Sequence, residues 1–182
     1  MNELDYILNR RSIRKFTDRK IDDALIGKIL EAAMHAPSAV NSQPWHFVVV
    51  DSREMMDRIM EVHPYAAMFR TASHGIVVCG DEQLQHGEGY WVVDCGAATQ
   101  NILLAAHALG IGSCWVGIHP RKERKEAFRR LLELPPHVNP FALVALGYPD
   151  EKKPRPVRFR PEKVKRNTWD HPYFSDDASS GP

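Results

Sequence analysis

Alternating runs of apolar and polar residues predict a chain that mixes helices and strands. Apolar residues at helical spacing predict a helix over 24–35, with Asp22 or Asp23 as its cap. Apolar runs bounded by turn residues predict four strands, at 46–50, 74–79, 112–118 and 138–146. Shorter helices are predicted at 4–9, 54–61 and 120–131. This order favours an α+β fold in which the main helices pack against one sheet.

One stretch, 91–109, is apolar on nearly all sides and rich in alanine. This pattern is typical of a helix buried in a core or in a subunit interface, and Gly110 is a natural C-terminal cap. The stretch also contains the polar residues Asp94, Gln100, Asn101 and His107, which make it a poor membrane span. We therefore expect no association with a membrane.

The chain is expected to form one domain with an extended arm. The predicted helices and strands all fall within residues 1–149. From Asp150 onward proline and basic residues dominate, so residues 150–174 are expected to be an arm that is ordered only where it lies on another surface. Residues 175–182 are expected to be a disordered tail.

Composition narrows the class of protein. The chain has 182 residues, of which 43% are hydrophobic and 26% charged, as is ordinary for a globular protein. A formal net charge of +1 argues against a protein that coats nucleic acid. The three cysteines form no metal-binding pair, so no metal site is expected. The first residues contain no signal-peptide pattern, and a cytoplasmic location is expected.

Although the net charge is near zero, the basic residues are concentrated in two clusters. Residues 152–166 hold eight basic residues against one acid, Glu162. The other cluster, near the start of the chain, consists of Arg10, Arg11, Arg14 and Lys15. The two clusters either meet around one anion or form two solvated surfaces. A nucleic-acid-binding arm is a third interpretation, which the lack of interleaved aromatic residues apart from Phe159 disfavours.

The first cluster has the pattern of a phosphate site. Arg10, Ser12 and Arg14 alternate, so in an extended segment they face the same way. Two guanidiniums and a hydroxyl on one face suit a phosphate group, although a solvated basic stretch has the same pattern. The sequence contains no glycine-rich nucleotide-binding loop, so a bound phosphate would be held by side chains.

Two further segments carry candidate binding groups. The loop 37–45 supplies neutral donors and acceptors that suit the edge of a heteroaromatic ring, or that simply stabilise a turn. At the end of the third predicted strand, Gly117 would let the backbone approach a ligand closely, or would allow tight packing on the central helix. No GxSxG or HExxH motif is present, so an enzyme of this sequence would rely on a cofactor for its chemistry.

Five segments, taken in order, resemble the FMN-dependent nitroreductase family. They are 10–16, 36–45, 94–101, 108–112 and 145–149, and the proline- and arginine-rich arm follows them. The resemblance implies a mixed or antiparallel sheet flanked by helices in an FMN-binding core, 1–149, with the arm 150–174 exchanged across a homodimer. It implies FMN at the dimer interface and NAD(P)H as the electron donor. The central helix would form much of the dimer core.

The resemblance also assigns roles to residues. The FMN phosphate would be held by Arg10, Ser12 and Arg14 and by an arm arginine, with Arg158 the best match and Arg160 or Arg155 as alternatives, while Arg11 joins them or faces away. The partner subunit would contribute the loop residues Pro37, Ser38, Ala39, Asn41 and Gln43, with Asn41 near the polar edge of the ring. Against the flavin would lie Trp115, Val116 and Gly117, with a backbone amide near Gly117 at the reactive nitrogen.

The implied reaction is a ping-pong hydride transfer from NAD(P)H through FMN to a small oxidant such as a nitroaromatic or a quinone. The stretch 62–73 is short, which leaves no room for a large lid and favours a broad range of small oxidants. The alternative is a non-catalytic protein that binds or senses flavin.

Overall fold

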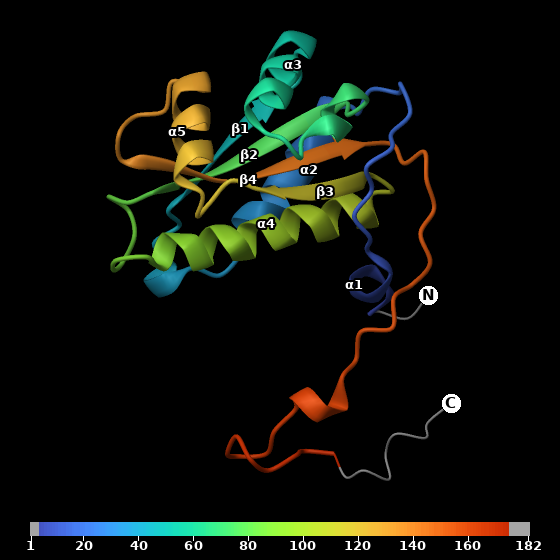
Figure 1. Cartoon of the computed structure of the whole chain (residues 1–182), viewed down its shortest axis with the longest axis vertical. Helices are drawn as coiled ribbons and strands as arrows, with labels where there is room; N and C mark the ends of the chain where they lie inside the picture. The colour runs from blue at the N-terminus through green and yellow to red at the C-terminus, as the bar shows by residue number, and fades with distance from the viewer. Residues whose placement is uncertain (1–3, 175–182) are drawn as a thin grey trace.

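A four-stranded antiparallel sheet forms the centre of the computed structural model, which describes residues 4–174 (Figure 1). Its strands are β1 (Trp45–Val50), β2 (His74–Asp81), β3 (Gly112–Gly117) and β4 (Val138–Gly147). They lie in the order β1-β2-β4-β3, so β1 and β3 are the two edges. All four predicted strands are present, and the predicted α+β class is confirmed.

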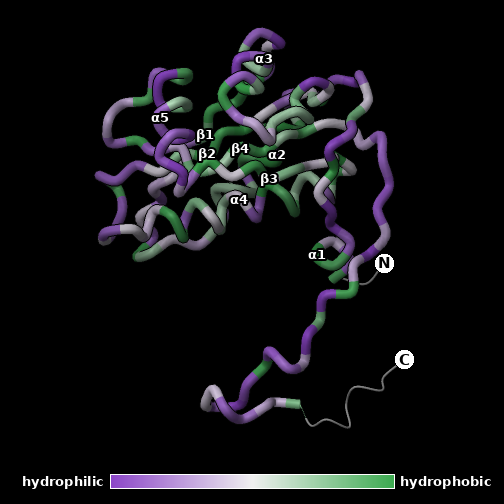
Figure 2. The backbone as a smooth tube through the Cα atoms, in the orientation of Figure 1, coloured by the Kyte–Doolittle hydropathy of each residue, from purple (hydrophilic) through white to green (hydrophobic). Residues whose placement is uncertain are grey.

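Helices cover both faces of the sheet (Figure 1). On one face α2 (Asp23–Met34) and α4 (Tyr90–Ala108) pack together, and on the other lie α3 (Arg53–Val62) and α5 (Lys122–Leu131). Alternating side chains of the central strands therefore enter two separate cores, and both β2 and β4 are buried along their whole length. Figure 2 shows this concentration of hydrophobic residues along the strands of the sheet.

The helix predicted over 24–35 is confirmed as α2, and Asp22 is its cap. The carboxylate of Asp22 accepts a hydrogen bond from the Ala24 amide at 3.0 Å. The remaining elements are α1 (Asp5–Asn9) and the 3-10 turns η1 (Ala39–Asn41), η2 (Ala67–Arg70) and η3 (Pro161–Lys163).

The central helix α4 is buried on one side only. Cys95, Ala98 and Ile102 are fully buried against the sheet, whereas Val93 is 70% exposed on the outer side. The helix therefore presents an apolar residue to solvent within the single chain.

The segment before the core, residues 15–17, runs beside the segment that follows β4, residues 148–150. The Thr17 amide donates to the Tyr148 carbonyl, and the Asp150 amide donates to the Lys15 carbonyl, each at 2.9 Å. Two glycines of the sheet, Gly112 in β3 and Gly147 in β4, let the N-terminal segment pack closely against it. A Cβ on Gly112 would lie 2.9 Å from Cγ2 of Ile13, and one on Gly147 would lie 2.6 Å from Cγ of Phe16.

Beyond residue 155 the arm extends away from the body of the molecule (Figure 1). It carries large apolar side chains that are exposed to solvent: Val157 is 87% exposed, Phe159 65% and Trp169 82%. Several large apolar side chains exposed on one extended segment offer a contact surface to another molecule. The tail expected at 175–182 lies outside the described residues.

Candidate functional site

A groove of about 700 Å³ lies beside the free edge of β3. Residues 114–117 of β3 form one wall, and η2 with the residues just before it forms the other. Arg14 and Lys15 line the end near the start of β3, and Arg124 of α5 lines the end near Gly117. This volume is typical of a site for a cofactor or a small molecule.

Alternate residues of β3 turn their backbone groups toward the groove. The Ser113 carbonyl accepts a hydrogen bond from the Ile13 amide at 2.9 Å, so it points away from β4. Backbone groups alternate in direction along a strand. The amides of Trp115 and Gly117 therefore also point away from β4, where they are available to an acceptor atom of a ligand.

Two side chains fix the end of this strand. The Gly117 carbonyl accepts a hydrogen bond from Nη1 of Arg124 at 2.9 Å, and it lies 3.0 Å from Nε2 of His63. Burial is the main cause that lowers the pKa of His63, which keeps its ring neutral. Both side chains therefore reach Gly117 from the side of β3 that faces away from β4.

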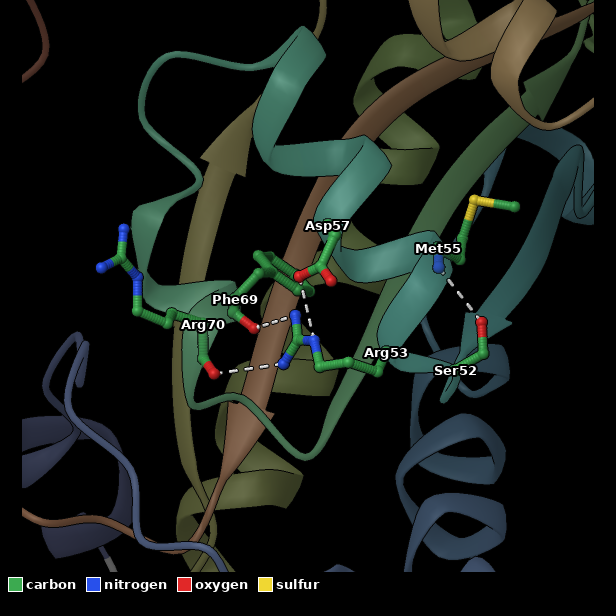
Figure 3. A network of polar contacts seen from close by, with 6 residues as sticks. All are labelled: Ser52, Arg53, Met55, Asp57, Phe69 and Arg70. Carbon is green, nitrogen blue, oxygen red and sulfur yellow. Dashed lines mark hydrogen bonds and ion pairs between the residues drawn. The ribbon is translucent and has the colours of Figure 1, made fainter.

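The other wall of the groove is tied to α3 by one arginine (Figure 3). The guanidinium of Arg53 donates to the carbonyls of Phe69 at 2.6 Å and of Arg70 at 3.1 Å, and it pairs with Asp57 at 3.0 Å. Ser52 caps the same helix by accepting the Met55 amide at 3.2 Å. These bonds hold the backbone of η2, while the Arg70 side chain points away from Arg53 (Figure 3).

The structure brings the two basic clusters together near the start of β3. Burial lowers the pKa of Arg10, and the neighbouring charges of Arg158 and Arg11 lower it further. Positive charges that repel one another in this way favour a negatively charged ligand between them. Arg160 lies two residues further along the arm, directly before η3.

Three other predicted site residues, Arg11, Ser12 and Arg14, form hydrogen bonds that join the arm to the core. Arg11 donates a hydrogen bond to the Pro154 carbonyl, and the Ser12 carbonyl accepts Nζ of Lys153 at 2.7 Å. The Arg14 amide donates to Oε1 of Glu151 at 2.6 Å, and this bond is the main cause that lowers the pKa of Glu151.

The predicted binding loop, residues 37–43, lies at the other edge of the sheet from the groove. Pro37, Ser38, Ala39, Asn41 and Gln43 precede β1, the edge strand opposite β3. Three inter-strand spacings separate these two edges, which is about 14 Å. A single chain therefore does not bring this loop to the groove.

The loop is nevertheless held in a defined and strained conformation. Val40, Asn41 and Gln43 have φ values of 47°, 59° and 48°, in the left-handed region. Asp94 of α4 accepts the Ala39 amide at 3.1 Å, and the Ser38 hydroxyl accepts the Gln43 amide at 3.0 Å. Backbone strain of this kind is concentrated at functional sites.

The three predicted residues of β3 divide between the faces of the sheet. The Val116 side chain belongs to the core under α3 and α5. The ring of Trp115 packs edge-on against Phe141, whose side chain lies in the core under α4, with the ring centroids 5.7 Å apart. Trp115 thus offers the groove its backbone, and its ring lies on the other face.

The groove is also lined by polar and aromatic residues that the sequence does not single out, among them His63, Tyr65, Arg70 and Arg124. His63, Tyr65 and Arg70 come from a segment more than forty residues before β3, and Arg124 comes from the helix that follows β3, so no local spacing marks them as one site. Within residues 4–174 no cluster of three His, Cys, Asp or Glu side chains has metal-binding geometry. In the same part of the chain, no helix combines the length and hydropathy of a membrane span.

A basic cluster beside a sheet-edge groove suits an anionic cofactor or substrate. The nitroreductase family model matches residues 7–66 and 60–148. A relative from Methanothermobacter thermautotrophicus is 50% identical over 169 residues, which cover 93% of this chain and 88% of that protein. Its name is "Putative NADH dehydrogenase/NAD(P)H nitroreductase".

Two solved structures have the same fold. One, from Parabacteroides distasonis, has a TM-score of 0.88 and 37% identity, and covers 91% of this chain and 98% of its own. The other, from Desulfovibrio desulfuricans, is described as a "putative nitroreductase in complex with fmn" and has a TM-score of 0.81 and 32% identity, with 93% and 98% coverage. The chain belongs to the nitroreductase family.

Proposed function

We propose that the protein is an FMN-dependent oxidoreductase that carries hydride from NAD(P)H to a small oxidant such as a nitroaromatic or a quinone. The observation that carries this proposal is the edge of β3 beyond Ser113, where the Trp115 and Gly117 amides border the groove beside a cluster of arginines. The family and the FMN complex of a related structure support the cofactor. A cytoplasmic location is part of the proposal.

The residues fit the two ends of FMN. Arg10 and Arg158 already lie close enough for their charges to repel, and a phosphate dianion between them would remove that repulsion. Ser12 and Arg14 follow on the same segment, and Arg14 lines the groove itself. At the other end, the amide of Gly117 would donate a hydrogen bond to the ring, and His63 and Arg124 hold its position.

A second copy of the chain would complete the site. The strained loop at 37–43 offers polar groups but lies at the wrong edge of its own sheet. The exposed Val93 on α4 and the exposed Val157 and Phe159 on the arm give a second copy apolar surface to cover. We therefore propose a homodimer in which the arm lies on the partner and the loop reaches the partner's groove.

FMN, when bound, supplies the redox chemistry by accepting a hydride and passing the electrons to an oxidant. The protein binds the phosphate, orients the ring edge and leaves one space for both donor and oxidant. Because donor and oxidant need the same space, they would bind in turn, which gives ping-pong kinetics. No acidic or basic side chain has to transfer a proton in this scheme.

The test is the visible spectrum of the purified protein followed by an acceptor screen. We expect a flavin absorption band, and oxidation of NADH or NADPH when a nitroaromatic or a quinone is added. Parallel lines in double-reciprocal plots at several donor concentrations would support the ping-pong order. A flavin-loaded protein without turnover would instead support a flavin-binding or flavin-sensing role.

A further inference from the structure

Arg124 places a cation at the end of the groove that is remote from the arginine cluster. Its guanidinium binds the Gly117 carbonyl, whereas the arginine cluster adjoins Ser113. The strand takes four residue steps from Ser113 to Gly117, which is about 13 Å. Arg124 is therefore separate from the group that would bind the FMN phosphate.

Within residues 4–174, most of the Arg124 donors have no hydrogen-bond partner. A guanidinium has five N–H donors, and Arg124 uses one of them, from Nη1, on the Gly117 carbonyl. No carboxylate of residues 4–174 forms an ion pair with it, and no acidic side chain from that range lines the groove. The side chain is half-buried, which makes a charge-assisted hydrogen bond stronger than it would be in open water.

An aromatic ring lies next to this cation. The guanidinium carbon of Arg124 is 5.3 Å from the ring centroid of Tyr65, and Tyr65 is 67% exposed. Both side chains line the groove together with Gly117. A ligand with a planar ring and an attached anion would therefore meet a stacking surface and a guanidinium at once.

We propose that Arg124 and Tyr65 select ligands that combine an aromatic ring with an anionic group, in preference to neutral ligands of the same shape. The inference rests on the proposed function, because the selected ligand is an electron acceptor or donor of that enzyme. An aromatic carboxylate acceptor and the extra phosphate of NADPH share this chemistry. The two sources are separated by experiment.

The experiment compares 4-nitrobenzoate with its neutral analogue 4-nitrobenzamide as acceptors for the flavin-loaded enzyme. We expect the carboxylate to have a kcat/KM about tenfold higher, as a single charge-assisted contact allows. Arg124→Gln should abolish this ratio, whereas Arg124→Lys should retain part of it. The preference should weaken as salt is added, because the site is open to solvent.

Arg130→Gln is the matched control. Arg130 lies on the same helix α5 but lines a separate cavity with Arg58 and Glu61. The variant removes the same charge and should leave the acceptor ratio unchanged. The ratio of KM for NADH and NADPH, measured in the same variants, identifies the donor phosphate as the source if it alone changes.

Binding measured without turnover separates this inference from the proposed function. Calorimetric titration of the purified flavin-loaded protein with benzoate and with benzamide should show tighter binding of benzoate, and Arg124→Gln should remove the difference. A protein that binds benzoate in this way but does not oxidise NAD(P)H retains the inference and loses the proposed function. Equal behaviour of the carboxylate and the amide, together with an NADPH preference that Arg124→Gln leaves unchanged, overturns the inference.

Discussion

The Nε2 atom of His63 lies 3.0 Å from the carbonyl oxygen of Gly117. The other ring nitrogen, Nδ1, accepts the Tyr65 amide at 3.2 Å, so the two partners assign the neutral Nε2–H tautomer. A proton on Nδ1 would abolish the bond to Tyr65. The hydrogen bonds that fix the groove therefore require an uncharged histidine.

This requirement predicts a loss of stability in mild acid. The pKa of His63 is lowered from its ordinary 6.5, mainly by burial, and burial lowers those of His74, His107 and His119 as well. A lowered pKa stabilises the fold fully above the unfolded-state value and loses that contribution as the pH falls toward the folded-state value. Urea midpoints should therefore fall between pH 7.5 and pH 5, and His63→Gln should reduce the slope. Midpoints that stay constant over this range would contradict the prediction.

The two close-approach glycines should be intolerant of alanine. In Gly112→Ala and Gly147→Ala the new methyl would displace Ile13 or Phe16, and overpacking of this kind costs about 1 to 3 kcal/mol. Both variants should also retain less FMN, because the same segment carries Ser12 and Arg14. In the control Gly27→Ala nothing lies within 4 Å of the new methyl, so this helical site should gain about 0.5 to 1 kcal/mol. Urea unfolding and flavin content give both readouts.

Arg10→Gln should separate ligand binding from stability. It removes a cation that Arg158 and Arg11 repel, so the flavin-free protein should be as stable as the parent or more so. The affinity for FMN should fall about tenfold or more, because a charge-assisted contact to phosphate is lost. Thermal unfolding of the flavin-free protein and fluorescence titration with FMN measure the two effects. Unchanged FMN affinity would place the phosphate elsewhere.

Arg53 should matter more than its ion pair does. Arg53→Gln removes the hydrogen bonds to the Phe69 and Arg70 carbonyls, and we expect a loss of about 1 to 2 kcal/mol and greater proteolysis of η2. Asp57→Asn leaves those bonds and removes only an exposed ion pair, which is worth about 0 to 1 kcal/mol. Equal losses in the two variants would show that the carbonyl bonds contribute little.

Local sequence patterns predicted most of the elements but not how they assemble. The spacing of apolar residues and the Asp22 cap identified α2 to within one residue at each end. The strand order β1-β2-β4-β3 depends on non-local pairing, which no short pattern encodes. The two basic clusters were visible in the sequence, while their meeting beside β3 depends on the backbone bonds between residues 15–17 and 148–150.

The same distinction holds for the candidate site. Gly117 was predicted because a glycine at a strand end is a local signal. His63 was missed because it lies more than fifty residues from the carbonyl that it binds, and a single histidine without a spaced partner carries no signature. Trp115 remains a predicted flavin neighbour: it lines the groove, and the alternation of the strand directs its ring toward Phe141.

In the proposed homodimer, each site combines the arginine segment of one subunit with the 37–43 loop of the other. Co-expression of an Arg10→Gln chain with a Ser38→Ala/Asn41→Ala chain, each with its own affinity tag, tests this claim most directly. Each homodimer should bind FMN poorly. The doubly purified heterodimer should hold about one FMN and show about half the parental NAD(P)H oxidation, since one of its two sites has both parts intact. A heterodimer as inactive as the two homodimers would contradict the shared site.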